Sequence, residues 1–207
     1  MLDTATTSSL HVGVVRGHSA PKVSYSVMEE SSISPLDRPL QRIARTVADL
    51  TAAIQGQTEA ALARRPDAAS WAAKEIVCHL RDIEELFLIR LEAIAAIDEP
   101  VILAAGMGAR AMNLKPDGQA AAPERWAEDR QYLRNDVGEA LAAFRRCRED
   151  TLAHLAALSP EQRRRGGIHP RLGRLTVADL VNDLASHDDS HLDQLRRAVY
   201  LASMRPA

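Results

Sequence analysis

The chain has 207 residues, 46% of them apolar, which fits one domain of ordinary size with a substantial core. Alanine and leucine supply 35 and 24 residues, whereas aromatic residues make up only 3%, and this bias towards strong helix formers argues against a β-sandwich, a barrel or a doubly wound sheet. The net charge of −2 argues against nucleic acid or an anionic membrane as a partner. The two cysteines give neither a metal-ribbon spacing nor a disulfide framework, so we expect a reduced, cytoplasmic compartment.

The N-terminal residues 1–33 are rich in serine and threonine and show no helical period of apolar residues. They also lack the basic region and the continuous apolar run of a secretory signal. We therefore predict a flexible tail over 1–33 and one domain over 34–207. No apolar run in the chain approaches the roughly 20 residues that span a bilayer, so we expect no membrane partner.

Proline positions divide this domain into segments that can be helical. A proline inside a helix costs about 3 kcal/mol, so helices are expected between prolines. The long proline-free segments are 40–65, 67–99, 124–159 and 171–205, and each carries apolar residues at three- and four-residue spacing. Four such amphipathic helices need one another to bury their apolar stripes, which predicts an all-α four-helix bundle. The long connection of about 98–123 has room for a crossover that would leave the second and third helices parallel.

Capping residues and apolar spacing add detail to these helices. Ser70 is expected to cap the second helix. Thr176, with Asp179 three residues later, is expected to form a near capping box at the start of the fourth. On the third helix, Leu133 and Cys147 are expected on the apolar face.

Three histidines stand on or beside apolar stripes. His187 and His191 replace apolar residues in the middle of the fourth helix, and their spacing of four puts both rings on one face. His79 lies between Ile76 and Ile83 on the second helix. A single buried histidine more often bonds a backbone carbonyl, but burying three imidazoles is costly without partners. A divalent metal would supply the partner, and three ligands would leave one coordination position open.

Carboxylates near these histidines are candidates for orienting them. Asp188, three residues before His191, is the candidate catalytic residue, as the acceptor for the second N–H of a metal-bound histidine. Asp82 stands three residues after His79 and is a second candidate for this role.

Other charged residues are interpreted as solvated. Glu75 and Asp183 are expected to be exposed helix charges, and His154 lies off the apolar face of its helix. His169, in a loop rich in glycine and proline, is also interpreted as solvated, with a place at the mouth of a site as the alternative. The arginines near 171–174 are interpreted as a solvated face, with an anion-attracting rim as the alternative.

The segment SWAAKEIVCHLRDIEELFLIRLEAI, with Trp71 before a helix and His79 on it, resembles the second helix of DinB-like (DinB/YfiT-like) proteins. The segment GRLTVADLVNDLASHDDSHLDQLRR resembles their last helix, with its H-x3-H pair and following Leu-x-Gln, and WAEDRQY and FRRCREDTLAHL are similar to their third. The resemblance covers roughly residues 36–203. It implies a four-helix bundle that holds a divalent metal on His79, His187 and His191, and a homodimer. It also implies a hydrolase or a transferase or isomerase that uses mycothiol, bacillithiol or glutathione.

We therefore expect a metal-dependent enzyme that acts on a small molecule, by hydrolysis or by thiol-dependent transfer. Zinc is the default metal, with nickel and iron as alternatives, and a low-molecular-weight thiol is a candidate cofactor. The alternative is a non-catalytic bundle that binds a small ligand or a protein, with a structural metal or none. Three histidine ligands rather than four count against a structural zinc.

Overall fold

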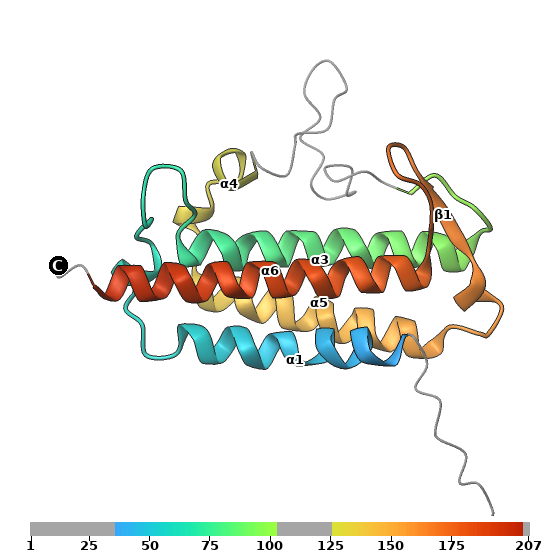
Figure 1. The fold of residues 1–207 in the computed structure, drawn as a ribbon, viewed down its shortest axis with the longest axis horizontal. Helices are drawn as coiled ribbons and strands as arrows, with labels where there is room; N and C mark the ends of the chain where they lie inside the picture. The colour runs from blue at the N-terminus through green and yellow to red at the C-terminus, as the bar shows by residue number, and fades with distance from the viewer. Residues whose placement is uncertain (1–35, 103–125, 205–207) are drawn as a thin grey trace, which may run out of the picture. The chain divides into compact units, whose positions relative to one another are not determined.

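The structure is a computed structural model that describes residues 36–102 and 126–204, and this part of the chain folds as a four-helix bundle (Figure 1). The long helices are α1 (Asp37–Ile54), α3 (Ala73–Ala96), α5 (Val137–Ala157) and α6 (Val177–Ser203). The predicted four-helix bundle is thus confirmed. The predicted tail, the boundary at residue 33 and most of the long connection lie outside the described residues. None of the described helices is long and apolar enough to cross a membrane.

Helices α3 and α5 run parallel, as the long connection between them suggested (Figure 1). Near the start of both helices, Lys74 Nζ donates to the Leu133 carbonyl at 3.4 Å. Past the end of both, the Gln162 amide donates to the Ala95 carbonyl at 3.1 Å. Helices α1 and α6 run in the opposite direction, and α3 packs against both α5 and α6. The pocket described below lies between α3 and α6.

The first helix ends earlier than the proline positions suggested. It stops at Ile54, and Gly56 follows with φ +75°, a left-handed conformation that glycine adopts without strain. The short helix α2 (Glu59–Leu62) comes next, and its cap, Thr58, accepts a hydrogen bond from the Ala61 N–H at 3.2 Å. A glycine therefore ends a helix that no proline interrupts.

Helix α3 begins at Ala73, and the prediction of Ser70 as its cap is wrong. The carboxylate of Glu75 accepts from the Ala72 N–H at 2.9 Å and takes over the capping role. Glu75 is fully buried and also accepts from Arg65 Nε at 2.7 Å, so the prediction that it is a solvated charge is wrong too. The Ser70 hydroxyl instead donates to Asp67 at 2.8 Å.

The third long helix starts later than predicted. A short helix α4 (Trp126–Asp129) and a 3-10 turn η2 (Tyr132–Arg134) precede it, and Asp136 caps it by accepting from the Glu139 N–H at 2.8 Å. Leu133 is exposed, contrary to the prediction. The inward position near the helix centre belongs to Arg148, whereas Cys147 is only half-buried.

A small β-hairpin that the all-α prediction omitted lies between α5 and α6. After the 3-10 turn η3 (Gln162–Arg164), β1 (Gly166–His169) pairs antiparallel with β2 (Gly173–Thr176). On its other edge, the Ile168 N–H donates to the Pro100 carbonyl at 2.7 Å. A side chain at Gly167 would meet Ile102 at 2.3 Å, so only glycine fits there. Thr176 then caps α6 with Asp179 in a capping box, as predicted.

A buried ionic cluster connects all four long helices. Arg148 donates to Asp188 at 2.7 Å, to Glu84 at 2.6 Å and to the Ile43 carbonyl at 2.7 Å. The hydroxyls of Thr46 and Thr151 donate to Asp188 and Glu84, both at 2.6 Å. The five residues whose side chains form these bonds are at most 1% exposed, so the charges are stabilised by one another and not by water. They are Thr46, Glu84, Arg148, Thr151 and Asp188.

Candidate metal centre

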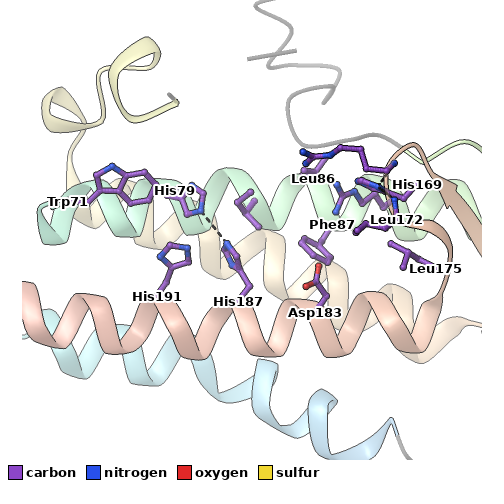
Figure 2. A pocket seen from close by; sticks show the side chains of 13 residues that line it. Trp71, His79, Leu86, Phe87, His169, Leu172, Leu175, Asp183, His187 and His191 are labelled. Carbon is purple, nitrogen blue, oxygen red and sulfur yellow. Dashed lines mark hydrogen bonds between the residues drawn. The ribbon is translucent and has the colours of Figure 1, made fainter. Parts of the chain in front are cut away.

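Three imidazole rings meet between α3 and α6 (Figure 2). His79 comes from α3, and His187 and His191 come from successive turns of α6. The Nε2 atoms of His79 and His187 are 3.2 Å apart, and each of the three rings offers a nitrogen within 4.8 Å of the other two. The histidines that the sequence placed on two separate helices therefore form one cluster.

The spacing of one nitrogen pair and the chemistry of all three rings fit a divalent metal. Zinc binds histidine nitrogen at about 2.0–2.1 Å, so two nitrogens on one tetrahedral zinc lie about 3.3–3.4 Å apart. The separation of the His79 and His187 Nε2 atoms, 3.2 Å, is close to that value. Neutral imidazole is also a ligand type that zinc, nickel and iron accept.

Gln194 orients one of the three rings. The Nδ1 atom of His191 lies 2.8 Å from the Gln194 Oε1 atom, which can only accept, so Nδ1 carries the hydrogen and Nε2 keeps its lone pair. Within the described part of the chain, the buried Nδ1 atoms of His79 and His187 have no hydrogen-bond partner.

Asp188 does not have the predicted place beside His191. Its carboxylate turns towards the core and accepts hydrogen bonds from Thr46 and Arg148. The residue that contacts the ring of His191 is Gln194, the last residue of the Leu-x-Gln motif. Asp188 therefore supports the helix that carries both histidines rather than the reacting groups.

The cluster keeps its histidines neutral. Burial, together with the neighbouring rings of His191 and His187, lowers the pKa of His79 to about 2. Burial and His191 lower the pKa of His187 to about 3. Burial also lowers the pKa of His191, with the Gln194 hydrogen bond opposing the shift. Unprotonated rings have lone pairs available for a metal at neutral pH.

These shifts predict that the metal-free protein loses stability in mild acid. Above pH 6.5 both the folded and the unfolded histidines are neutral, so the shifts have no effect there. As the pH falls below 6.5, His79 and His187 bind protons in the unfolded chain but not in the folded one, and this difference favours unfolding. Urea unfolding of chelator-treated protein at pH 7 and pH 5 should show a loss of about 2 kcal/mol for each of these residues. The loss should be smaller in His187→Gln, and an equal loss in that variant would contradict the assignment.

Two tryptophans flank the cluster, and they are the only two in the chain. The ring centroid of Trp71 is 4.9 Å from that of His79 and 6.0 Å from that of His191, with which it stacks. The Trp126 centroid is 6.5 Å from that of His79. Both indoles thus lie beside the cluster, and their fluorescence should respond to a metal bound there.

Asp82 holds the segment that carries Trp126. Its carboxylate accepts from the Tyr132 hydroxyl at 2.6 Å and pairs with Arg130. The guanidinium of Arg130 lies 4.3 Å from the centre of the Trp126 ring. The predicted hydrogen bond from His79 to Asp82 is therefore wrong, and Asp82 instead binds residues close to Trp126.

A pocket of about 410 Å³ opens at the three histidines and extends between α3 and α6 (Figure 2). Its middle is apolar, and its far end reaches the hairpin. The lining residues are Trp71, His79, Ile83, Leu86, Phe87, Arg90, His169, Arg171, Leu172, Leu175, Asp183, His187 and His191. The volume is in the range of small-molecule sites.

Comparison with known families identifies the family of this chain. The family model described as "DinB superfamily" matches residues 42–195 of the chain, which include all three histidines. The chain belongs to the DinB superfamily. No curated protein matches it.

A solved structure shares the DinB fold of this chain. This chain is similar to that structure, YfiT from Bacillus subtilis, with a TM-score of 0.66 and 20% sequence identity over 88% of this chain and 92% of YfiT. YfiT is described as "a probable metal-dependent hydrolase with an unusual four-helix bundle topology". At this identity the likeness shows a common fold.

Two residues that line the pocket of this DinB-superfamily chain, Arg90 and Asp183, were not predicted as site residues, although Asp183 is exposed as predicted. His169 is buried in the pocket wall, which agrees with the alternative of a site mouth rather than with the solvated interpretation. Arg90 follows His79 by 11 residues, which is three helical turns, so the shared face was a signal that could have found it. Cys78, beside His79 in sequence, packs in the core as expected, and burial raises the pKa of its thiol to about 11.

Proposed function

We propose that this chain is a metal-dependent hydrolase that acts on a small molecule, with a divalent metal on His79, His187 and His191. The convergence of three neutral imidazoles at one end of a pocket is the observation that carries the proposal. Three protein ligands leave a coordination position for water or substrate, as in catalytic rather than structural zinc sites. The description of YfiT as a metal-dependent hydrolase with this fold supports the same chemistry.

The bound metal would supply Lewis acidity and an activated water at neutral pH. The chain itself holds and shields that centre. Gln194 fixes the His191 tautomer so that Nε2 faces the cluster with its lone pair. Trp71 and Trp126 exclude water from one side of His79, and the apolar wall formed by Ile83, Leu86 and Phe87 receives the body of the substrate.

We propose zinc as the metal, with nickel and iron as the alternatives that metal analysis would distinguish. Thiol-dependent transfer, the homodimer and the cytoplasmic location stay predictions. A cobalt-substituted protein tests the thiol directly, because a thiolate that reaches an open position gives a charge-transfer band. A protein whose metal only supports the fold would show no such band with either thiol or azide.

The hydrolase proposal is tested by the metal dependence of hydrolysis. A panel of chromogenic esters and amides should be cleaved by zinc-loaded protein at least tenfold faster than by chelator-treated protein, because the activated water needs the metal. His187→Ala should abolish the difference, and the matched control His154→Ala, on α5 and outside the pocket, should keep it. Equal rates with and without metal across the panel would contradict the proposal.

A further inference from the structure

The two ends of the pocket differ in chemistry. One end holds the three histidines, and the other holds charged and polar groups from α3, α6 and the hairpin (Figure 2). Arg90 and His169 form buried walls of this far end, and Arg171 and Asp183 line it from exposed positions. Between the ends the lining is apolar. The pocket therefore has a reaction end, an apolar middle and a charged far end.

Helix geometry places Arg90 and the histidine cluster along one line. Eleven residues separate Arg90 from His79, which corresponds to three turns and about 16 Å along the helix axis. Ile83 and Leu86 lie on the same stripe of α3 between them and line the same pocket. A molecule that touched both ends would need an apolar segment in its middle.

Arg90 is buried at the far end. It is 7% exposed, and its guanidinium lies 5.1 Å from the centre of the Phe87 ring. Burial lowers the pKa of Arg90, while the charge of Asp183 opposes the shift. A guanidinium fixed in a partly dry pocket binds an anion more strongly than one free in water, because less entropy is lost and screening is weaker.

His169 adds a second donor at this end. Its Nδ1 atom accepts hydrogen bonds from the backbone N–H groups of Arg171 and Leu172, both at 3.2 Å. An Nδ1 that accepts cannot carry hydrogen, so the hydrogen of the neutral ring is on Nε2. The hairpin turn thus presents a donor rather than an acceptor.

The balance of charge favours a singly charged anion. Among the described lining residues, the two guanidinium groups of Arg90 and Arg171 face the single carboxylate of Asp183. Counted over these described side chains alone, the net charge of +1 matches a carboxylate, whereas a phosphate dianion would leave excess negative charge beside Asp183. A guanidinium also fits a carboxylate in geometry, through two parallel hydrogen bonds.

We propose that the far end of the pocket binds a carboxylate of the substrate, with Arg90 and Arg171 as the binding residues. This inference rests on the proposed function for the reaction itself. It makes the substrate class small acids in which an apolar segment separates the carboxylate from the bond that is hydrolysed. The charge of Asp183 limits the affinity for this class.

Ligand-observed NMR titration of chelator-treated protein tests the carboxylate site without the metal. Hexanoate should bind about tenfold or more tightly than hexanamide, because only the acid makes charge-assisted hydrogen bonds. Arg90→Gln and Arg171→Gln should each weaken hexanoate binding, and Asp183→Asn should strengthen it. Arg174→Gln, on the same hairpin but paired with Glu99 outside the pocket, should leave it unchanged.

Arg171 and Asp183 are exposed, and their variants are expected to change hexanoate binding in opposite directions. The test therefore remains decisive even if Arg90→Gln fails to fold. Equal binding of acid and amide, preference for hexylamine, or unchanged binding in both Arg171→Gln and Asp183→Asn would overturn the proposal. Hexanoate binding only after zinc is added would place the carboxylate on the metal and would also overturn it. Because the test uses metal-free protein, failure of the hydrolase proposal leaves its outcome unaffected.

Discussion

Replacement of Arg148 by methionine is expected to destabilise the bundle by about 3–5 kcal/mol, a large part of the stability of an ordinary domain. The change removes the only cation of the buried ionic cluster and leaves the carboxylates of Glu84 and Asp188 in the core without a counter-charge. Buried unpaired carboxylates must either be desolvated as ions or take up protons, and both lower stability at neutral pH.

Chemical denaturation of Arg148→Met measures this effect. Arg146→Met, an exposed position on the same helix, is the matched control and should stay within about 0.5 kcal/mol of the parent. Replacing Glu84 and Asp188 by leucine together with Arg148→Met should recover much of the loss, since a buried ionic cluster is often exchangeable for an apolar one. An Arg148→Met protein as stable as the parent would show that the cluster has little role in the fold.

The four long helices could be predicted because proline spacing and apolar periodicity are local properties of the chain. The ends of those helices depended on contacts that spacing does not encode. Glu75 caps α3 only because the backbone and Arg65 bring donors to it, and a carboxylate three residues inside a helix is also typical of a solvated surface. Which side chain caps a helix therefore depends on contacts from elsewhere in the fold, and this limited the accuracy of the predicted helix boundaries.

The histidine cluster was predictable because polar residues replaced apolar ones at helical spacing. Arg148 satisfied the same criterion, four residues after Phe144, but the charged group of an arginine on an apolar stripe usually extends to solvent. The hairpin had no such signal, because its four-residue strands are rich in glycine and lack alternation. The burial of His169 follows from the hairpin and could not be predicted without it.

Loss of any one cluster histidine is expected to lower metal affinity by at least a hundredfold, because one of three ligands disappears. His79→Ala and His191→Ala remove ligands from α3 and α6 respectively, and His154→Ala, half-buried on α5, is the matched control. Circular dichroism checks that each variant keeps its helices. A control variant that lost as much affinity as the cluster variants would place the metal elsewhere.

The most direct measurement is a calorimetric titration of tag-free, chelator-treated protein with zinc, followed in parallel by tryptophan fluorescence. We expect one zinc per chain, a fluorescence change from the two indoles beside the cluster, and loss of both signals in His79→Ala and His191→Ala. Absence of saturable zinc binding in the parent protein, or binding that survives in both variants, would contradict the assignment of the three histidines as a metal centre.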